Sequence, residues 1–382
     1  MTTEIKTCSK CVMDGTVPGI TFDENGICNY CKLHDTLVDA FPAGEAGDEK
    51  LKSIVAEIKS GSGGKTYDCI IGVSGGTDST YLLHWAKENG LRPLAVHLDN
   101  GWDSEIAVAN IKKSISALGV DLRTYVIDWE EIKDILRSFL KASYPWADLP
   151  TDIAITSSLY RIAAEENIKY VITGNNFRVE GKQPIDWTYG DGKLVSAIHK
   201  MFGNGRMKSF PNLTLTRFAY YTLIRKIKII RPFYYMNFDK KAAQKMLTER
   251  YGWVNYGGHH HESLFTRFVI AMWLPKKFNI DKRKVTWSAL VREGQMSRDE
   301  ALAGLEELPY DAARMEEDVD YVIKKLDLTR EEFDRIFALP NKSFRDYPSY
   351  FPLFTSMKRL MRFVFKFVLP WKPPFFYQLD SK

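Results

Sequence analysis

The chain has 382 residues, of which 45% are hydrophobic and 26% are charged, a mixture that is typical of a globular protein with a substantial core. This composition excludes a mainly disordered, collagen-like or coiled-coil architecture, and the length suggests about two to three domains. The net charge of +5 is unevenly spread: residues 200–250 carry twelve Lys or Arg against two acids, and residues 342–382 carry eight against two. This asymmetry indicates a polyanionic partner, namely a nucleotide, a nucleic acid or a lipid headgroup.

Four of the five cysteines form two CxxC pairs near the N-terminus, Cys8 with Cys11 and Cys28 with Cys31. Four thiolates at this spacing can close a tetrahedron around Zn²⁺, and the Gly and Pro turns between the pairs suit a zinc ribbon. Because protein ligands fill all four positions, we expect a structural metal. An iron–sulfur cluster is the main alternative, and a redox dithiol is a weaker one.

We assign residues 1–62 to this zinc-ribbon module and a linker, which ends near a Gly/Ser-rich stretch. Apolar runs then alternate with helical patterns. The patterns predict strands over residues 67–73, 94–98, 122–127 and 170–173, and helices over 78–89, 104–118 and 152–166. Such βαβ units form a parallel sheet that binds ligands at the carboxyl ends of its strands. We assign residues 63–235 to this α/β domain, and predict that residues 236–382 are mainly helical.

A glycine-rich loop follows the first predicted strand of the α/β domain and leads into a helix. Its glycines let backbone N–H groups approach an anion, and the helix N-terminus adds a favourable dipole. Asp78 is a poor neighbour for phosphate unless Mg²⁺ lies between them, so we assign it an indirect role in magnesium binding. The loop is not a Walker A motif, because no Gly-Lys-Ser/Thr follows. Its residues are Ser74, Gly75, Gly76, Thr77, Asp78 and Ser79.

This hexapeptide resembles the SGGxDS signature of the PP-loop, or N-type, ATP pyrophosphatases. These enzymes split ATP into AMP and pyrophosphate by adenylating an oxygen of the substrate, and a nitrogen or sulfur nucleophile then displaces AMP. The resemblance implies a five-stranded parallel sheet flanked by helices, with Ser74 and Asp78 as catalytic residues. The ATP-binding residues that it implies are the six loop residues with Asp99, Gly174 and Asn175.

A narrower resemblance extends over nearly the whole chain. Its segments are CSKCVMDGTVPGITFDENGICNYC, VSGGTDS, HLDNGW, ITGNN, RPFYYMN, WVNYGGHHHESLFTRF, LPKKFNIDKRK and EGQMSRDEAL. Together they are similar to the N-acetyl sugar amidotransferases of bacterial surface-polysaccharide and nonulosonic-acid pathways. The resemblance implies that ATP and Mg²⁺ serve to convert an acetamido group of a nucleotide-linked sugar to an acetamidino group through an O-adenylyl imidate.

The source of the nitrogen is expected to be a different protein. A thiol glutaminase needs a reactive Cys served by a His. Four cysteines are assigned to metal, Cys69 falls in a predicted buried strand, and position 2 holds Thr2 rather than an N-terminal Cys. The family resemblance likewise implies separate subunits, similar to the glutaminase and cyclase of histidine biosynthesis, that deliver ammonia.

Charged residues near the predicted loops are further candidates. Lys182 and Arg178 follow the Gly174 loop closely enough to contact phosphates, and Lys182 is our third catalytic candidate, although both side chains can equally be solvated. Asp152 and Asp186 are candidates for metal binding or for orienting the substrate. Asp152 is equally suited to cap a helix.

Three consecutive histidines make residues 256–263 the most unusual segment outside the loop. Such a run could ligate metal, act as acid or base, or bind sugar hydroxyls and a diphosphate. The histidines lack the i, i+4 spacing of helical metal ligands. We therefore predict that His260, His261 and Glu262 bind substrate and that Arg267 adds a phosphate contact, with a structural turn as the alternative.

A tRNA-thiolating PP-loop enzyme is the main alternative function, since two CxxC pairs and a basic surface would also suit that class. Such enzymes need a reactive cysteine or a cluster to deliver sulfur, and Cys69 is better suited to packing. A nucleotide-binding scaffold without catalysis is a third interpretation. We favour the sugar amidotransferase and expect no nucleic-acid partner.

The C-terminal tail over residues 357–369 is basic and apolar. This composition fits a helix in a membrane interface, and a helix docked on the protein's own core or on a partner is the alternative. No run approaches the roughly eighteen apolar residues that span a bilayer, and no secretory segment precedes Cys8. We expect a cytoplasmic protein, which touches the inner face of the cytoplasmic membrane only if the tail is interfacial.

Overall fold

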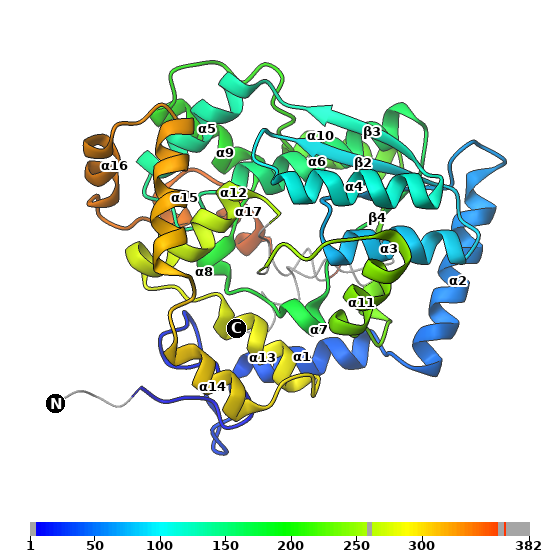
Figure 1. The fold of residues 1–382 in the computed structure, drawn as a ribbon, viewed down its shortest axis with the longest axis horizontal. Helices are drawn as coiled ribbons and strands as arrows, with labels where there is room; N and C mark the ends of the chain where they lie inside the picture. The colour runs from blue at the N-terminus through cyan, green and yellow to red at the C-terminus, as the bar shows by residue number, and fades with distance from the viewer. Residues whose placement is uncertain (1–4, 258–261, 358–362, 364–382) are drawn as a thin grey trace.

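A five-stranded parallel sheet forms the centre of the α/β domain. Figure 1 shows part of this sheet among the helices that pack on it. The structure is a computed structural model, and it describes residues 5–257, 262–357 and 363. The strand order is β3-β2-β1-β4-β5, which confirms the predicted α/β class. The strands are β1 (Cys69–Gly72), β2 (Pro93–Asp99), β3 (Asp121–Val126), β4 (Tyr170–Ile172) and β5 (Lys228–Ile230).

Four of these strands coincide with the predicted apolar runs to within two residues. The residues themselves did not predict β5, although the superfamily resemblance implied a fifth strand. β5 has three residues, begins at the exposed Lys228 and pairs with β4 in parallel. Such a short strand within a basic stretch has no periodic apolar pattern that the sequence could reveal. Its extended conformation depends on the hydrogen-bonded pairing with β4.

Helices cover both faces of the sheet. Ile71 of β1 packs in one apolar cluster with residues of α2 and α3, whereas the adjacent Ile70 packs in another with residues of α6. Successive side chains of a strand point to opposite faces, so β1 is buried on both. The helices of this domain are α2 (Glu45–Ser62), α3 (Thr77–Glu88), α4 (Glu105–Leu118), α5 (Trp129–Lys141) and α6 (Leu149–Glu165).

The N-terminal module is a small cysteine-bearing unit followed by two helices. Isolated antiparallel bridges join Thr7 to Asp14 and Phe22 to Cys28, and α1 (Asn29–Ala40) begins directly after the last bridge. The stretch that we interpreted as a linker contains α2, which packs against the sheet. The Gly/Ser-rich residues form the end of α2, where Gly63 adopts a left-handed conformation with φ of +58°.

Short helices follow β4, and the region beyond residue 236 is mainly helical, as predicted. The short helices are α7 (Phe177–Glu180), α8 (Ile185–Thr188), α9 (Gly192–Phe202) and α10 (Leu215–Ala219). The later helices are α11 (Lys240–Tyr251), α12 (Leu264–Phe268), a π-helix (Val269–Lys277), α13 (Arg283–Arg292), α14 (Arg298–Glu306), α15 (Ala312–Lys325), α16 (Arg330–Phe337) and α17 (Phe351–Ser356).

The N-terminal module and the C-terminal region share one apolar core. Met13 and Val17 belong to the same buried cluster as Trp273 of the π-helix and Phe333 of α16. In Figure 1, α1, α13 and α14 accordingly lie together on the side away from the sheet. The two ends of the described chain therefore stabilise each other.

Among the described residues, no helix combines the length and the apolar character needed to cross a bilayer. The basic tail over residues 357–369 lies outside the described residues except for Met357 and Phe363. An interfacial role for this tail therefore stays a prediction.

Candidate functional site

The SGGTDS loop (Ser74–Ser79) connects β1 to α3 at the carboxyl edge of the sheet. Gly75 has φ of +76°, and a Cβ atom there would lie 2.3 Å from the carbonyl oxygen of Ala107, so this position requires glycine. The carbonyl oxygen of Gly75 accepts hydrogen bonds from Asn110 at 3.3 Å and from Trp253 at 2.9 Å. These contacts from α4 and from the segment after α11 fix the loop at the N-terminus of α3, where an anion is favoured.

Described residues on either side of the histidine run lie against this loop. The Ser74 hydroxyl donates to Oε1 of Glu262 at 3.4 Å, and a Cβ atom on Gly76 would lie 3.0 Å from the hydroxyl oxygen of Tyr256. Burial, with the nearby carboxylates of Glu262 and Asp78, raises the pKa of the Tyr256 hydroxyl. The structure thus brings a predicted substrate-binding residue, Glu262, to the predicted ATP-binding loop. His260 and His261 lie outside the described residues.

The strand β2 and its following segment position Glu262. The Ser104 backbone N–H donates to the Glu262 carbonyl at 2.8 Å, and Asp103 forms an antiparallel bridge with Ser263. Asp99, the last residue of β2, accepts from the Gly101 N–H at 2.9 Å and starts the turn that leads there. Two segments that are far apart in sequence, residues 99–104 and residues 262–263, therefore meet at the carboxyl edge.

Asp78 lies in the first turn of α3, where Gly174 and Lys240 approach it. A Cβ atom on Gly174 would be 3.5 Å from the Asp78 Cβ, so the loop after β4 packs directly on Asp78. The Lys240 ammonium group lies 3.5 Å from Oδ2 of Asp78. Lys240 is not among the predicted site residues, and its only signal in the sequence is its place at the start of a helix in the basic stretch. Asn175 is exposed, whereas Asn176 is buried and caps α7.

Arg178 and Lys182 do not contact the loop in the structure. The Arg178 guanidinium is buried, pairs with Glu293 at 3.1 Å and donates to the Phe41 carbonyl at 2.9 Å. Protein groups hold the Arg178 guanidinium, and its contact with phosphate stays a prediction. Lys182 donates to the Tyr234 hydroxyl at 2.9 Å and lines a small cavity between α1, α7 and α13. A catalytic role for Lys182 stays a prediction without a described contact to the loop.

The other acidic and basic candidates have protein partners. Arg267 pairs with Asp318 of α15, with Nε 2.7 Å from Oδ2. Asp186 pairs with Arg345. Asp152 accepts a hydrogen bond from the Trp146 indole at 2.6 Å. Among the described substrate-binding candidates, Glu262 is the one in contact with the SGGTDS loop, and the roles of Asp186 and Arg267 stay predictions.

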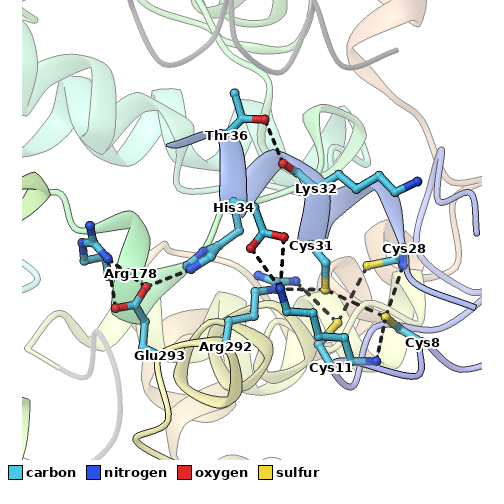
Figure 2. Close-up of polar contacts among 12 residues, drawn as sticks. Cys8, Cys11, Cys28, Cys31, Lys32, His34, Thr36, Arg178, Arg292 and Glu293 are labelled. Atoms are coloured by element: carbon cyan, nitrogen blue, oxygen red, sulfur yellow. Dashed lines mark hydrogen bonds and ion pairs between the residues drawn. The ribbon is translucent and has the colours of Figure 1, made fainter. Parts of the chain in front are cut away.

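The four N-terminal cysteines form a buried cluster, which Figure 2 shows. The sulfur atoms of Cys8 and Cys31 are 3.9 Å apart, those of Cys11 and Cys28 are 3.8 Å apart, and all four lie within 4.8 Å of one another. Zinc with bonds of about 2.3 Å to each sulfur would space them by about 3.8 Å. The donor set therefore fits one tetrahedral ion. A four-iron cluster would hold the thiolates farther apart, because each would bind a different iron.

Arg292, at the end of α13, points into the sulfur cluster (Figure 2). Its Nε donates to the Cys31 sulfur at 3.3 Å and its Nη2 to the Cys11 sulfur at 3.5 Å. Burial lowers the pKa of Arg292, but the neighbouring thiolates outweigh this effect and raise it. A buried cation thus faces a site where four thiolates on a divalent ion would leave a net negative charge.

A group of charged side chains lies next to Arg292 (Figure 2). The next residue, Glu293, accepts from Nε2 of His34 at 2.8 Å and pairs with Arg178 at 3.1 Å. Burial raises the pKa of Glu293, but His34 and Arg178 outweigh it and hold that pKa low. Because Arg178 belongs to α7, which follows the Gly174 loop, its pairing with Glu293 links α7 to the end of α13, where Arg292 contacts the cysteines.

Several solved structures resemble the chain weakly. The U34-tRNA thiolase NcsA from Methanococcus maripaludis, with its 4Fe-4S cluster, is 14% identical with a TM-score of 0.32 over 80% of this chain and 90% of that chain. The NH3-dependent NAD synthetase from Campylobacter jejuni is 14% identical with a TM-score of 0.32 over 69% of this chain and 98% of that chain. At these values neither resemblance indicates a substrate or a cofactor. No curated protein matches the chain.

Two family models match parts of the chain. Residues 68–147 match the queuosine biosynthesis protein QueC, a PP-loop family, and residues 262–361 match the C-terminal domain described as LPS biosynthesis protein WbpG-like. The first match contains the SGGTDS loop with β1 to β3, and the second begins at Glu262, which contacts that loop. Residues 68–147 are thus similar to a PP-loop family, and residues 262–361 are similar to the C-terminal domain of a WbpG-like LPS biosynthesis protein.

Proposed function

We propose that the chain is an ATP-dependent amidotransferase that converts the acetamido group of a nucleotide-linked sugar to an acetamidino group and releases AMP and pyrophosphate. The observation that carries the proposal is the contact between Ser74 of the PP-loop and Glu262, the first residue of the WbpG-like domain. The family name of that domain supports a sugar substrate in lipopolysaccharide biosynthesis. If one matched region binds ATP and the other binds the sugar, the two regions must lie together so that the substrates can react. The contact between Ser74 and Glu262 meets this requirement.

The chemistry explains why ATP is required. An acetamido carbonyl is a poor electrophile, because its nitrogen donates electrons into it. Transfer of AMP to the amide oxygen creates a good leaving group, and ammonia can then displace AMP. The SGGTDS loop and Lys240 would bind the phosphates, while Tyr256 and Glu262 would cover the loop and limit access of water. Mg²⁺, held through Asp78, would supply positive charge to the departing pyrophosphate.

Two features support amidation over tRNA thiolation. Cys69, the cysteine outside the cluster, is fully buried, and burial raises the pKa of its thiol. A thiol in this state is a poor sulfur carrier, because the thiolate is the reactive form. The close spacing of the other four sulfurs suits a single tetrahedral ion better than a sulfur-donating cluster.

The test is an incubation of candidate nucleotide-linked N-acetyl sugars with the protein, ATP, Mg²⁺ and ammonium, followed by mass spectrometry. The proposal predicts a product in which NH has replaced oxygen, formed together with AMP and pyrophosphate. Unfractionated tRNA in a parallel reaction with a sulfide donor provides the comparison. Thiolated tRNA, with no change in any sugar, would contradict the proposal and favour the thiolase.

Zinc is the metal that we assign to the cysteine cluster. The purified protein is expected to contain about one zinc per chain, because a closed four-thiolate site retains its ion. Elemental analysis before and after removal of Mg²⁺ with a mild chelator measures this content. Iron together with acid-labile sulfide would contradict the assignment.

Ammonia is expected to come from a separate glutaminase. All five cysteines are buried, so no described thiol is available to attack glutamine. The purified chain should therefore make the amidine with ammonium salts but not with glutamine, and addition of a partner glutaminase should restore glutamine use. Product formation is followed by mass spectrometry. Glutamine hydrolysis by the chain alone, at a rate that matches amidination, would show that a glutaminase lies within it.

A further inference from the structure

The buried histidine His97, in β2, has no role in the mechanism above. Its Nδ1 lies 3.0 Å from the carbonyl oxygen of Val73, the residue that directly precedes the SGGTDS loop. Its Nε2 lies 3.3 Å from Oδ2 of Asp103, in the segment that follows β2. Only 8% of the residue is exposed. Both ring nitrogens therefore face oxygen atoms of the protein.

The two contacts together favour a positively charged ring. A carbonyl oxygen can only accept, so Nδ1 carries a proton, and the carboxylate of Asp103 favours a second proton on Nε2. A neutral ring would instead turn a nitrogen lone pair toward this carboxylate. Burial lowers the pKa of His97, but the hydrogen bond and the charge of Asp103 outweigh it, with the Val73 carbonyl and the charge of Asp99, and the pKa is raised.

Asp103 belongs to the joint between the two regions that match family models. It forms an antiparallel bridge with Ser263, within a short ladder that pairs residues 102–104 with residues 262–264. The first segment lies in the match over residues 68–147, and the second begins the match over residues 262–361. The hydrogen bonds of the ladder run from the Ser104 N–H to the Glu262 carbonyl, at 2.8 Å, and from the Leu264 N–H to the Trp102 carbonyl, at 2.9 Å.

The ladder holds the backbone of Glu262, whose side chain reaches the SGGTDS loop. The Ser74 hydroxyl donates to Oε1 of Glu262 at 3.4 Å, which is long for a hydrogen bond, so a small shift of either segment would break it. His97 touches the chain on both sides of this contact. Val73 is the neighbour of Ser74, and Asp103 pairs with Ser263, the neighbour of Glu262.

We propose that His97 is a positioning residue whose imidazolium fixes the ladder against the end of β1 and thereby keeps the Glu262 carboxylate on Ser74. The inference rests on the proposed function, because Glu262 and Ser74 lie where the sugar and ATP are proposed to meet. Displacement of a site group by about 1 Å can reduce a rate by about 10²-fold. A side chain that holds both Val73 and Asp103 prevents such a displacement.

Hydrogen exchange measures the ladder directly. His97→Leu removes both donors, so the N–H groups of Ser104 and Leu264 should exchange with deuterium at least about 10-fold faster than in the wild type. His84→Leu is the matched control, because Nδ1 of His84 lies 2.8 Å from the hydroxyl oxygen of Tyr251, which belongs to α11 rather than to the ladder. Unchanged exchange of both N–H groups in a folded His97→Leu variant contradicts the inference.

A double-mutant cycle tests whether His97 acts through Glu262. His97→Leu should lower kcat/KM of amidination for the sugar by about 10–100-fold. The same substitution should cost less than about 2-fold when Glu262 is already Ala, because the group to be positioned is then absent. His84→Leu should have one and the same small effect in both backgrounds. An equal loss from His97→Leu with and without Glu262 would show that His97 supports the fold in general and does not position Glu262.

NMR titration of the wild-type ring gives a result even if His97→Leu does not fold. The ring should titrate above the ordinary histidine pKa of about 6.5, so protection of the ladder should be complete at low pH and decrease as the pH rises through the raised value. A ring that titrates at or below the ordinary value contradicts the inference. Wild-type protein that makes no amidine contradicts the proposed function, whereas exchange and titration still decide whether His97 holds the ladder.

Discussion

Replacement of Asp78 by Ala is expected to abolish sugar-dependent pyrophosphate release while the protein stays folded. Asp78 lies in the first turn of α3, with Lys240 at 3.5 Å and the Gly174 loop packed on it. Without this carboxylate the loop would lose the indirect hold on Mg²⁺ that we propose, and Lys240 would lose its partner. Loss of such preorganised charge reduces rates by about 10²–10³-fold or more. Release of pyrophosphate with and without sugar measures the effect.

The matched control is Asp48→Ala. Asp48 also occupies the first turn of a helix, α2, but it is exposed and belongs to no predicted site. Both substitutions remove a favourable interaction with a helix dipole, worth about 0.3–1 kcal/mol, so their effects on thermal unfolding should be similar. Pyrophosphate release should be lost in Asp78→Ala and should keep the wild-type rate in Asp48→Ala. A folded Asp78→Ala variant that releases pyrophosphate at the wild-type rate would show that the loop takes no part in the reaction.

Replacement of Arg292 by Met is expected to produce the largest loss of stability. The guanidinium donates to the sulfurs of Cys31 and Cys11, and its removal would leave the negative charge of a four-thiolate metal site buried without a counter-ion. Breaking a buried ion pair from one side costs about 3–5 kcal/mol. Loss of a group that supports metal ligands also weakens metal binding by about 10–100-fold. Denaturant unfolding and zinc transfer to a competing chelator measure the two effects.

Arg298→Met is the control for the charge of Arg292. Arg298 donates to the backbone carbonyls of Cys8 at 2.9 Å and Cys11 at 3.2 Å, and its contacts with the cluster are with neutral groups. Its loss should cost about 1 kcal/mol per hydrogen bond and leave zinc transfer nearly unchanged. Equal zinc retention in the Arg292 and Arg298 variants would show that neutralisation of the thiolates does not explain the position of Arg292.

The sequence predicted the first four strands, the SGGTDS loop and the cysteine cluster, because short segments of the chain determine each of them. Apolar runs located β1 to β4, and the glycines of the SGGTDS loop identified the turn into α3, where Gly75 has positive φ. The CxxC spacing identified the four cysteines that the structure brings together. In each case residues close together in the sequence determine the structure. Apolar periodicity therefore reveals a strand, glycine reveals a turn, and CxxC spacing reveals metal ligands.

The parts that the sequence analysis missed depend on contacts between distant segments. Arg292 reaches cysteines that are more than 250 positions away, Lys240 reaches Asp78, and Lys282 stacks on Trp146. A lysine or arginine in a helical pattern ordinarily indicates a solvated face, and only the packing of α11 and α13 gives these side chains a partner. Arg178 likewise pairs with a residue distant in sequence, Glu293, which directly follows α13.

Isotope transfer tests the central claim most directly. The acetamido oxygen of the sugar is labelled with ¹⁸O, the reaction is run with ATP, Mg²⁺ and ammonium, and AMP is analysed by mass spectrometry. If the amide oxygen attacks ATP, that oxygen leaves on AMP, so the account predicts ¹⁸O in the AMP phosphate at a yield equal to that of the amidine. Amidine formed together with unlabelled AMP would contradict activation through an O-adenylyl imidate.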